Sequence, residues 1–194
     1  MLLHSIAHIE YSAIDLALDA AYRFSGLPKE YYDDWLEVAE DEIRHFRMIE
    51  TLLHEVGGVY GEYSVHDGLF EAMRKTPTLL SRMAVVPRYL EAGGLDANPK
   101  IIQKLSKFKD QFAQKMIDAQ EIILAEEISH VQKGDKWFKY ACDLDGKNYD
   151  IYFKILKEIM PNSAKKKNFI NKEARLEAGF SCEELNQIST KQEC

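Results

Sequence analysis

Several features that assign a chain to a specialised class are scarce in this sequence of 194 residues. Its three cysteines, Cys142, Cys182 and Cys194, form no C-x-x-C pair and no even set. A disulfide-rich secreted scaffold and a rubredoxin-type iron site are therefore excluded, and we expect free thiols in a reducing cytoplasm. No apolar run reaches the roughly 18 residues that a membrane span requires, and the N-terminal segment turns polar too soon for a signal peptide. We therefore expect a cytoplasmic protein that does not enter a membrane.

Basic residues are in the minority. Lysine and arginine number 25 against 32 acidic residues, which gives a formal net charge of -7 at pH 7. Non-specific binding of nucleic acid needs a basic surface that releases counterions, so nucleic acid is not an expected partner. With 46% hydrophobic and 29% charged residues, the composition is otherwise that of an ordinary globular protein with a buried core.

Alternation of apolar and polar residues, the pattern of a half-buried strand, is almost absent. Leu, Ala, Glu and Lys instead recur at spacings of three and four residues, so the predicted fold class is all-α. The long helices are expected over about Leu3–Phe24, from Pro28 to Val56, from Thr76 and Pro77 onward, and then through Tyr140. A long connection over 57–75, with a helical turn at Leu69–Met73, is expected between the second and third of these.

The third helix and the C-terminal part contain the clearest interruptions. Pro87 is expected to kink the third helix, and we predict that it breaks over Gly93–Pro99. A shorter helix to Met160 and a capping box formed by Ser181 and Glu184 are predicted further on. These patterns suggest a four-helix domain over residues 1–145 and a helical extension over 146–194 that packs on it.

The second helix carries polar residues on the side that should be buried. At 3.6 residues per turn, Glu42 and His45 share a stripe with Trp35, Val38, Ile49 and Leu52. A hydrogen-bonded polar pair in the core would explain one such E-x-x-H pattern. The segment "LAEEISHV" at 124–131 repeats it, with Glu127 and His130 on a stripe that also holds Met116, Gln120, Ile123, Val131 and Gly134. Chance does not readily explain two such inward pairs.

The other two long helices each place one acid on their apolar stripe. Glu10 is aligned with Leu3, Ile6, Ala13, Ala17 and Phe24, and Glu91 is aligned with Leu80, Ala84 and Pro87. Four carboxylates around one core would repel one another and cost several kcal/mol each without a compensating cation. A pair of divalent or trivalent metal ions is the natural candidate.

Acids that share metals must lie at the same height along a bundle. Glu10 and Glu42 are equally far in sequence from a turn at Gly26, so we expect them side by side. Glu91 and Glu127 satisfy the same condition only if the chain continues through the break at Gly93–Pro99 and reverses near Phe108–Gln111. The connection over 57–75 must then return along the bundle as a long crossover.

This set of polar residues resembles the metal ligands of the ferritin-like di-iron carboxylate superfamily. In that superfamily two helices each supply one Glu, and the other two helices each supply an E-x-x-H pair. "DEIRH" at 41–45 is similar to the D-E-x-R-H motif of bacterial di-iron monooxygenases. The segments "AHIEYSAIDLALDAAYRF", "VHDGLFEAM" and "RMAVVPRYLEAGGLD" resemble a family of uncharacterised ferritin-like proteins of bacteria and archaea, to about Phe180. This resemblance implies a ferritin-like four-helix bundle with a long crossover between its second and third helices. The implied metal ligands are Glu10, Glu42, His45, Glu91, Glu127 and His130. The metals that the resemblance implies are Fe/Fe first, with Mn/Fe or Mn/Mn as alternatives.

The resemblance supplies no settled activity, so the functional hypotheses come from the ligand set. The first is an oxidoreductase that activates O2 or peroxide to oxidise a small organic substrate, with electrons from an external donor because no flavin or nicotinamide motif is present. Iron handling as a ferroxidase or storage protein is an alternative, and a tRNA hydroxylase is another, although the acidic charge weighs against it. A metal-free bundle leaves the four inward acids unexplained. The oligomeric state stays open, with a homodimer among the options.

Residues near the expected ligands carry further hypotheses. Asp41 and Glu126 each precede an E-x-x-H glutamate, and a carboxylate there could accept an imidazole N–H. His8 lies two positions from Glu10 and therefore points to another face of the helix, so we expect no metal contact from it. His66, in the long connection, is interpreted as a capping or surface residue.

Overall fold

The computed structural model describes residues 1–161 and 165–194, and the regular elements of these residues are helical. They are α1 (Leu2–Arg23), α2 (Lys29–Glu55), α3 (Gly68–Arg74), α4 (Leu79–Val85), the π-helical segment η1 (Val86–Glu91), α5 (Ala92–Leu105), α6 (Gln111–Leu144), α7 (Ile151–Ile159), α8 (Lys172–Glu177) and α9 (Cys182–Ile188). The all-α prediction is confirmed, with one isolated bridge between Lys167 and Ser189. None of the helices in the described ranges combines the length and apolarity that a membrane span requires.

The described chain divides into two compact units. Unit 1 comprises residues 1–71 and 104–123, and unit 2 comprises residues 72–103 and 124–194. The predicted boundary at residue 145 falls inside unit 2, and the division into a bundle and an extension stays a prediction.

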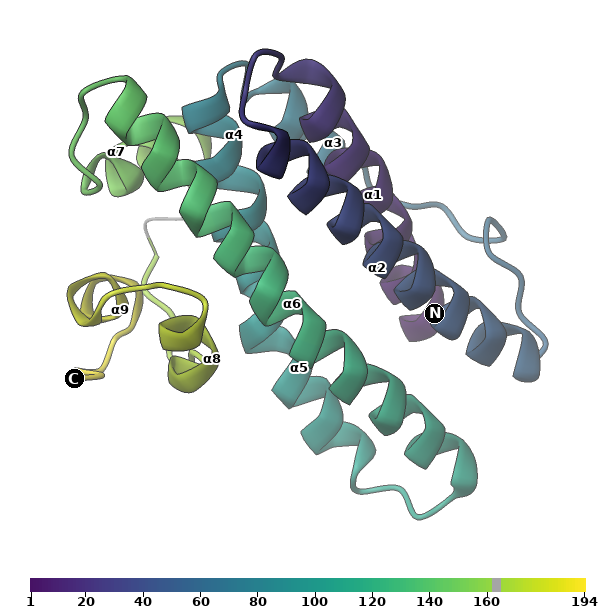
Figure 1. Ribbon diagram of the computed structural model, residues 1–194. Coiled ribbons are helices and arrows are strands. Elements are labelled where there is room, and N and C mark those ends of the chain that lie inside the picture. Colours follow the sequence, from purple (N-terminus) through teal and green to yellow (C-terminus); the bar gives the residue numbers. More distant parts are fainter. Residues whose placement is uncertain (162–164) are drawn as a thin grey trace. The chain divides into compact units, whose positions relative to one another are not determined.

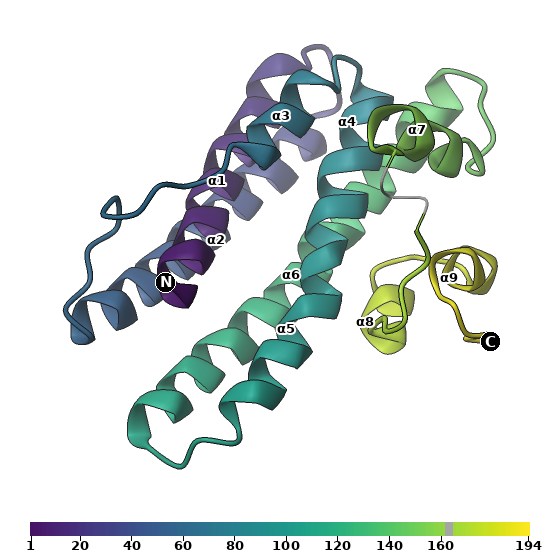
Figure 2. The ribbon, with the colours of Figure 1, turned by 180° about the vertical axis from the view of Figure 1, so that it is seen from behind.

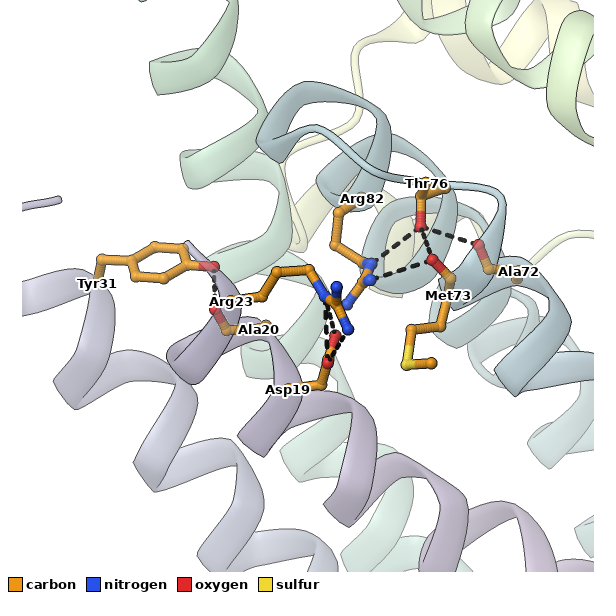
Figure 3. Close-up of polar contacts among 8 residues, drawn as sticks. All are labelled: Asp19, Ala20, Arg23, Tyr31, Ala72, Met73, Thr76 and Arg82. Atoms are coloured by element: carbon orange, nitrogen blue, oxygen red, sulfur yellow. Dashed lines mark hydrogen bonds and ion pairs between the residues drawn. The ribbon is translucent and has the colours of Figure 1, made fainter. Parts of the chain in front are cut away.

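Helices α1 and α2 form an antiparallel pair in unit 1 (Figure 1). Both lie within two residues of the predicted bounds, and the turn between them contains Gly26 at φ +77°, a backbone conformation that glycine adopts without strain. The hydroxyl of Tyr31, near the start of α2, donates a 3.0 Å hydrogen bond to the carbonyl of Ala20 in α1 (Figure 3). This bond joins the two helices close to their connecting turn.

The start of the third long helix differs from the prediction. The cap is Thr78, whose side chain and that of Ser81 form a reciprocal capping box at the start of α4. Thr76 instead donates from its hydroxyl to the carbonyl of Ala72 at 2.8 Å and accepts a 2.9 Å hydrogen bond from Nε of Arg82 (Figure 3). Arg82 is buried and needs acceptors, which explains why Thr76 lies in the connection from α3 and not in the cap.

The predicted break over Gly93–Pro99 is wrong, because α5 runs as one helix through these residues. The irregularity lies earlier, in η1, where Pro87 has no N–H to donate and the N–H of Ala92 bonds to the carbonyl of Pro87 five positions back. Figure 2 shows α4 passing through this segment into α5. The next interruption falls at residues 106–110, near the predicted reversal at Phe108–Gln111.

Gly134 of α6 lies against Pro87 of η1. A Cβ built on Gly134 would overlap Pro87 Cβ and lie 2.6 Å from its Cγ, whereas one built on Gly94 of α5 would meet nothing within 4 Å. Gly134→Ala should therefore lower the free energy of unfolding by about 1–3 kcal/mol through overpacking. The matched change Gly94→Ala should raise it by roughly 0.5–1 kcal/mol, because alanine loses less backbone entropy in a helix. Denaturant unfolding of both variants tests this, and equal effects would contradict the close packing of Gly134.

The C-terminal segment confirms one prediction and corrects another. Ser181 and Glu184 form the predicted capping box at the start of α9. The expectation of three free thiols is wrong, since Cys182 and Cys194 form a disulfide with their Cα atoms 5.7 Å apart, which leaves Cys142 free and buried. The two cysteines are 12 positions apart in sequence, and the capping box sets the direction in which the helix carrying Cys182 begins.

Candidate metal centre

Helices α1 and α2 bring three of the six predicted ligands together in unit 1. Nδ1 of His45 lies 3.4 Å from Oε2 of Glu10 and 3.4 Å from Oε2 of Glu42. Glu42 and His45 are fully buried, and Glu10 is 6% exposed. The three side chains each offer one ligand atom, and these atoms lie within 4.8 Å of one another.

The sequence spacing explains this meeting. Glu10 and Glu42 are equally far from the turn at Gly26, and the antiparallel helices bring them level. The apolar neighbours that define the α2 stripe are all buried, namely Trp35, Val38, Ile49 and Leu52. On α1, Ile6, Ala13 and Ala17 are buried in the same way above and below Glu10. The predicted inward direction of these three side chains is confirmed.

Burial and proximity change the protonation of this trio. Burial, together with the negative charge of Glu42, raises the pKa of Glu10 to about 7, although His45 opposes this rise. Burial by itself would lower the pKa of His45, but the hydrogen bonds and charges of Glu10 and Glu42 raise it to about 10. In the metal-free protein an imidazolium therefore supplies the positive charge among these acids. A metal ion must displace that proton, because a ligating imidazole is neutral.

Stability of the metal-free protein should consequently fall as pH rises. The folded-state pKa values of Glu10 and His45 lie above their usual values of 4.5 and 6.5. Between about pH 4.5 and 10 the folded chain thus binds more protons than the unfolded chain, so this stability is fully present at low pH and is lost through that window. We expect the free energy of unfolding after chelation to be about 1–3 kcal/mol lower at pH 8 than at pH 6.

Denaturant titrations at the two pH values provide the measurement. Glu10→Gln, which removes one of the two titrating groups, should flatten the dependence. An unchanged slope in that variant would contradict the assignment of the effect to this trio.

The other three predicted ligands belong to unit 2. Glu127 and His130 lie one turn apart on α6, with Nδ1 of His130 4.0 Å from Oε2 of Glu127. His130 is fully buried and the side chain of Glu127 is 13% exposed. Glu91 is the last residue of η1, and its Oε2 is buried. Each unit therefore contains one E-x-x-H pair and one single glutamate.

The donor set suits a transition metal. Carboxylate oxygens and imidazole nitrogens are common ligands of iron and manganese, and an ion placed among the ligand atoms of unit 1 would offset the repulsion between Glu10 and Glu42. The 4.8 Å limit on their separations allows one ion to reach all three after small side-chain rotations. The residues of unit 1 therefore fit a metal ion, and the matching pair on α6 supplies the same types of atom.

A pair of histidines before Glu10 has a structural partner that the sequence pattern did not reveal. His8 lies 3.0 Å from the hydroxyl of Tyr60 through Nδ1 and 2.8 Å from the carbonyl of His66 through Nε2. Because a carbonyl only accepts, Nε2 carries the proton and Nδ1 accepts from Tyr60. Nε2 of His4 accepts from the backbone N–H of Gly61 at 3.0 Å. These bonds fix the long connection to α1, and the absence of a metal contact from His8 stays a prediction.

Two further predictions concern residues beside the ligands. The imidazole of His66 accepts a long 3.4 Å hydrogen bond from the N–H of Gly68 where α3 begins, which agrees with its capping interpretation. Asp41 forms an ion pair of 2.5 Å with Arg44. The role of Asp41 and Glu126 as acceptors for the metal-binding imidazoles stays a prediction.

Sequence patterns also missed a buried ion-pair cluster on the segment that carries Glu91. Nε of Arg88 donates to Asp135 of α6 at 2.7 Å, and Nη2 donates to Glu184 of α9 at 2.7 Å. Its guanidinium lies over the rings of Phe138, Tyr152 and Phe180 at 4.9, 4.3 and 4.6 Å from their centroids. Arginine within a helical run reads as a surface residue in sequence, so only the fold reveals this cluster.

Comparison with known proteins gives two findings. A family described as "Protein of unknown function (DUF455)" matches residues 1–186. An uncharacterised protein of Haemophilus influenzae is 39% identical over 196 residues, which cover 96% of this chain and 66% of that protein, so the chain spans slightly less than two thirds of its relative. No solved structure matches the chain. With a family match over nearly its whole length, this chain belongs to the DUF455 family.

Proposed function

We propose that this chain is a di-metal carboxylate oxidoreductase with a ferritin-like four-helix bundle. In this proposal Glu10, Glu42 and His45 of unit 1 and Glu91, Glu127 and His130 of unit 2 hold two metal ions, most simply two irons. The buried Glu10–Glu42–His45 trio is the observation that carries the proposal. The matching Glu127–His130 pair on α6 supports it, because ferritin-like di-metal sites use two such pairs.

The bound metals would supply redox chemistry that activates O2 or peroxide toward a small organic substrate. The chain's own groups hold the ions and set their charge. Four carboxylates and two neutral imidazoles give a donor set with four negative charges, which suits two divalent ions and tolerates a higher oxidation state. The buried apolar residues around Glu42, such as Val38 and Ile49, exclude water from this part of the core.

Protons must move when the site changes its metal content. His45 holds a proton in the metal-free protein and must release it on binding, so metal affinity should increase as pH rises. We find no nicotinamide or flavin motif in the sequence, and we propose that a separate protein or small molecule donates the electrons. We further propose a small organic compound as substrate.

The first experiment is the metal content of protein from cells grown with iron, measured by mass spectrometry and followed by reduction and exposure to oxygen. About two ions per chain, together with oxygen consumption and absorbance changes after reduction, would support the proposal. Hundreds of irons per assembly would indicate storage instead. Absence of metal after anaerobic loading with ferrous iron would overturn the proposal and leave a polar core.

A further inference from the structure

Unit 2 contains a cavity that the proposed metal site does not use. Its volume is about 240 Å³, and its walls come from η1, α7, residues 165–167, α8 and α9. Tyr89, Tyr152, Phe153, Leu156 and Ile188 form the aromatic and apolar part of the lining. Ligand pockets usually measure roughly 300–1,000 Å³, so this cavity suits a ligand with about one ring and its substituents.

The remaining lining is strongly basic in a chain of net charge -7. Among the described residues, five cationic side chains line the cavity and no carboxylate does, the cations being Lys157, Lys165, Lys166, Lys167 and Arg175. Asp96, behind this lining, neutralises part of the charge, because it accepts bonds from Lys167 at 2.8 Å and from Arg175 at 2.7 and 2.9 Å.

The three other lysines at this cavity bring positive charge that Asp96 does not offset. Nζ of Lys166 donates to the carbonyl of Asn186 at 2.9 Å, and a neutral carbonyl does not cancel an ammonium charge. Lys157 and Lys165 are exposed side chains that the cavity shares with solvent. Lysine ammonium groups bind phosphate as flexible point charges, and several of them favour a dianion over a monoanion.

Contacts within the protein hold the aromatic part of the lining in place. Tyr152 is 1% exposed, and its hydroxyl donates to the carbonyl of Arg88 at 3.0 Å. The rings of Phe138 and Phe153 pack against it at centroid distances of 5.8 and 5.0 Å. A ligand therefore meets a fixed aromatic surface, which reduces the entropy lost on binding.

We propose that this cavity binds a small phosphate monoester with an aromatic or apolar body. The phosphate would lie among Lys157, Lys165 and Lys166, and the body would contact Tyr89 and Phe153. Tyr89 and Glu91 are two residues apart on η1 and so point to different sides of that segment. The site is therefore separate from the proposed metal centre, and its test does not depend on bound metal.

Isothermal titration calorimetry of the full chain with phenyl phosphate tests the proposal, with inorganic phosphate, phenol and benzoate as partial probes. We expect one phenyl phosphate per chain, bound at least about tenfold more tightly than any partial probe. The affinity should fall as salt is added, because the lysines are exposed. Lys165→Ala/Lys166→Ala should weaken binding by about tenfold or more, and Gln187→Glu, at an exposed lining position, should weaken it by repulsion.

The matched control is Lys107→Ala/Lys109→Ala, which removes two exposed lysines outside the cavity lining. Its affinity for phenyl phosphate should equal that of the unaltered chain. If both double variants weakened phenyl phosphate binding equally, the loss of affinity would come from the lower net charge of the chain and not from this cavity, which would overturn the proposal. Benzoate binding as tight as that of phenyl phosphate would overturn the preference for a dianion, and absence of phenyl phosphate binding would overturn the site itself.

Discussion

Glu42→Ala protein from iron-supplemented cells will contain less than one metal ion per chain, against about two in the unaltered protein if both proposed metals bind. Glu42 is fully buried, and its Oε2 lies 3.4 Å from Nδ1 of His45. Its loss removes one proposed ligand and also removes a negative charge beside His45 and Glu10. Changes to groups that merely orient metal ligands lower affinity by about 10- to 100-fold, and the loss of a ligand should cost more. Metal content after dialysis, measured by mass spectrometry, checks this result.

Glu127→Ala should cause a similar loss, because the proposal places Glu127 on the same metals. Matched controls are Glu40→Ala on α2 and Glu121→Ala on α6, which remove exposed acids from the same helices. Both controls should keep full metal content. If Glu127→Ala retained two ions while Glu42→Ala lost them, the metal would belong to unit 1 alone and the two-unit ligand set would be wrong.

Arg88→Met should lower the free energy of unfolding by about 3–5 kcal/mol, the range observed when one partner of a buried ion pair is removed. Arg88 is 1% exposed and bonds to both Asp135 and Glu184, so methionine would leave two partly buried acids with less compensation. Lys139, 2.6 Å from Asp135, limits this loss. Denaturant unfolding, with the midpoint and slope compared between variants, provides the value.

Arg88→Lys separates charge from geometry. Lysine keeps the positive charge but cannot bond to two acids through a planar guanidinium. We therefore expect the free energy of unfolding of Arg88→Lys to lie between that of the unaltered chain and that of Arg88→Met. Lys29→Ala, which removes an exposed ion pair with Asp33, should leave stability nearly unchanged. A loss in Arg88→Met no larger than that in Lys29→Ala would show that the buried cluster contributes little.

Periodicity predicted the α1–α2 part of the fold well. The stripe through Glu42 and His45 and the turn at Gly26 specified which side chains are buried and which acids lie level. These properties follow from helix geometry and from local turn residues, which a single sequence contains. The inward trio of unit 1 could therefore be predicted from the sequence alone, whereas the joining of all six ligands remains a proposal.

Other features depend on partners that are distant in sequence. Thr76 fits an N-cap pattern in the sequence, but its hydroxyl oxygen accepts a hydrogen bond from the buried guanidinium of Arg82. Thr78 is therefore the N-cap residue of α4. Asp96 in α5 similarly accepts from Arg175, which no local pattern connects to it. Competition among acceptors is decided by tertiary packing, so sequence patterns locate the helices more reliably than their caps and ion pairs.

The π-helical segment η1 makes chain length itself a determinant of structure. Consecutive α-helical residues rotate by about 100°, and the wider turn of η1 offsets the faces of α4 and α5 from a continuous α-helical phase. Because an i to i+5 turn takes up about one residue more than an α-helical turn, deleting one residue from 86–91 and restoring regular α-helix would leave α5 in nearly the same rotation relative to α4. Regular α-helix at unchanged length would instead rotate α5 by about 100° and turn Asp96 away from Arg175 and Lys167. The wide turn of η1 thus keeps the acid of α5 facing its cationic partners although the segment is one residue longer than a regular helix would need.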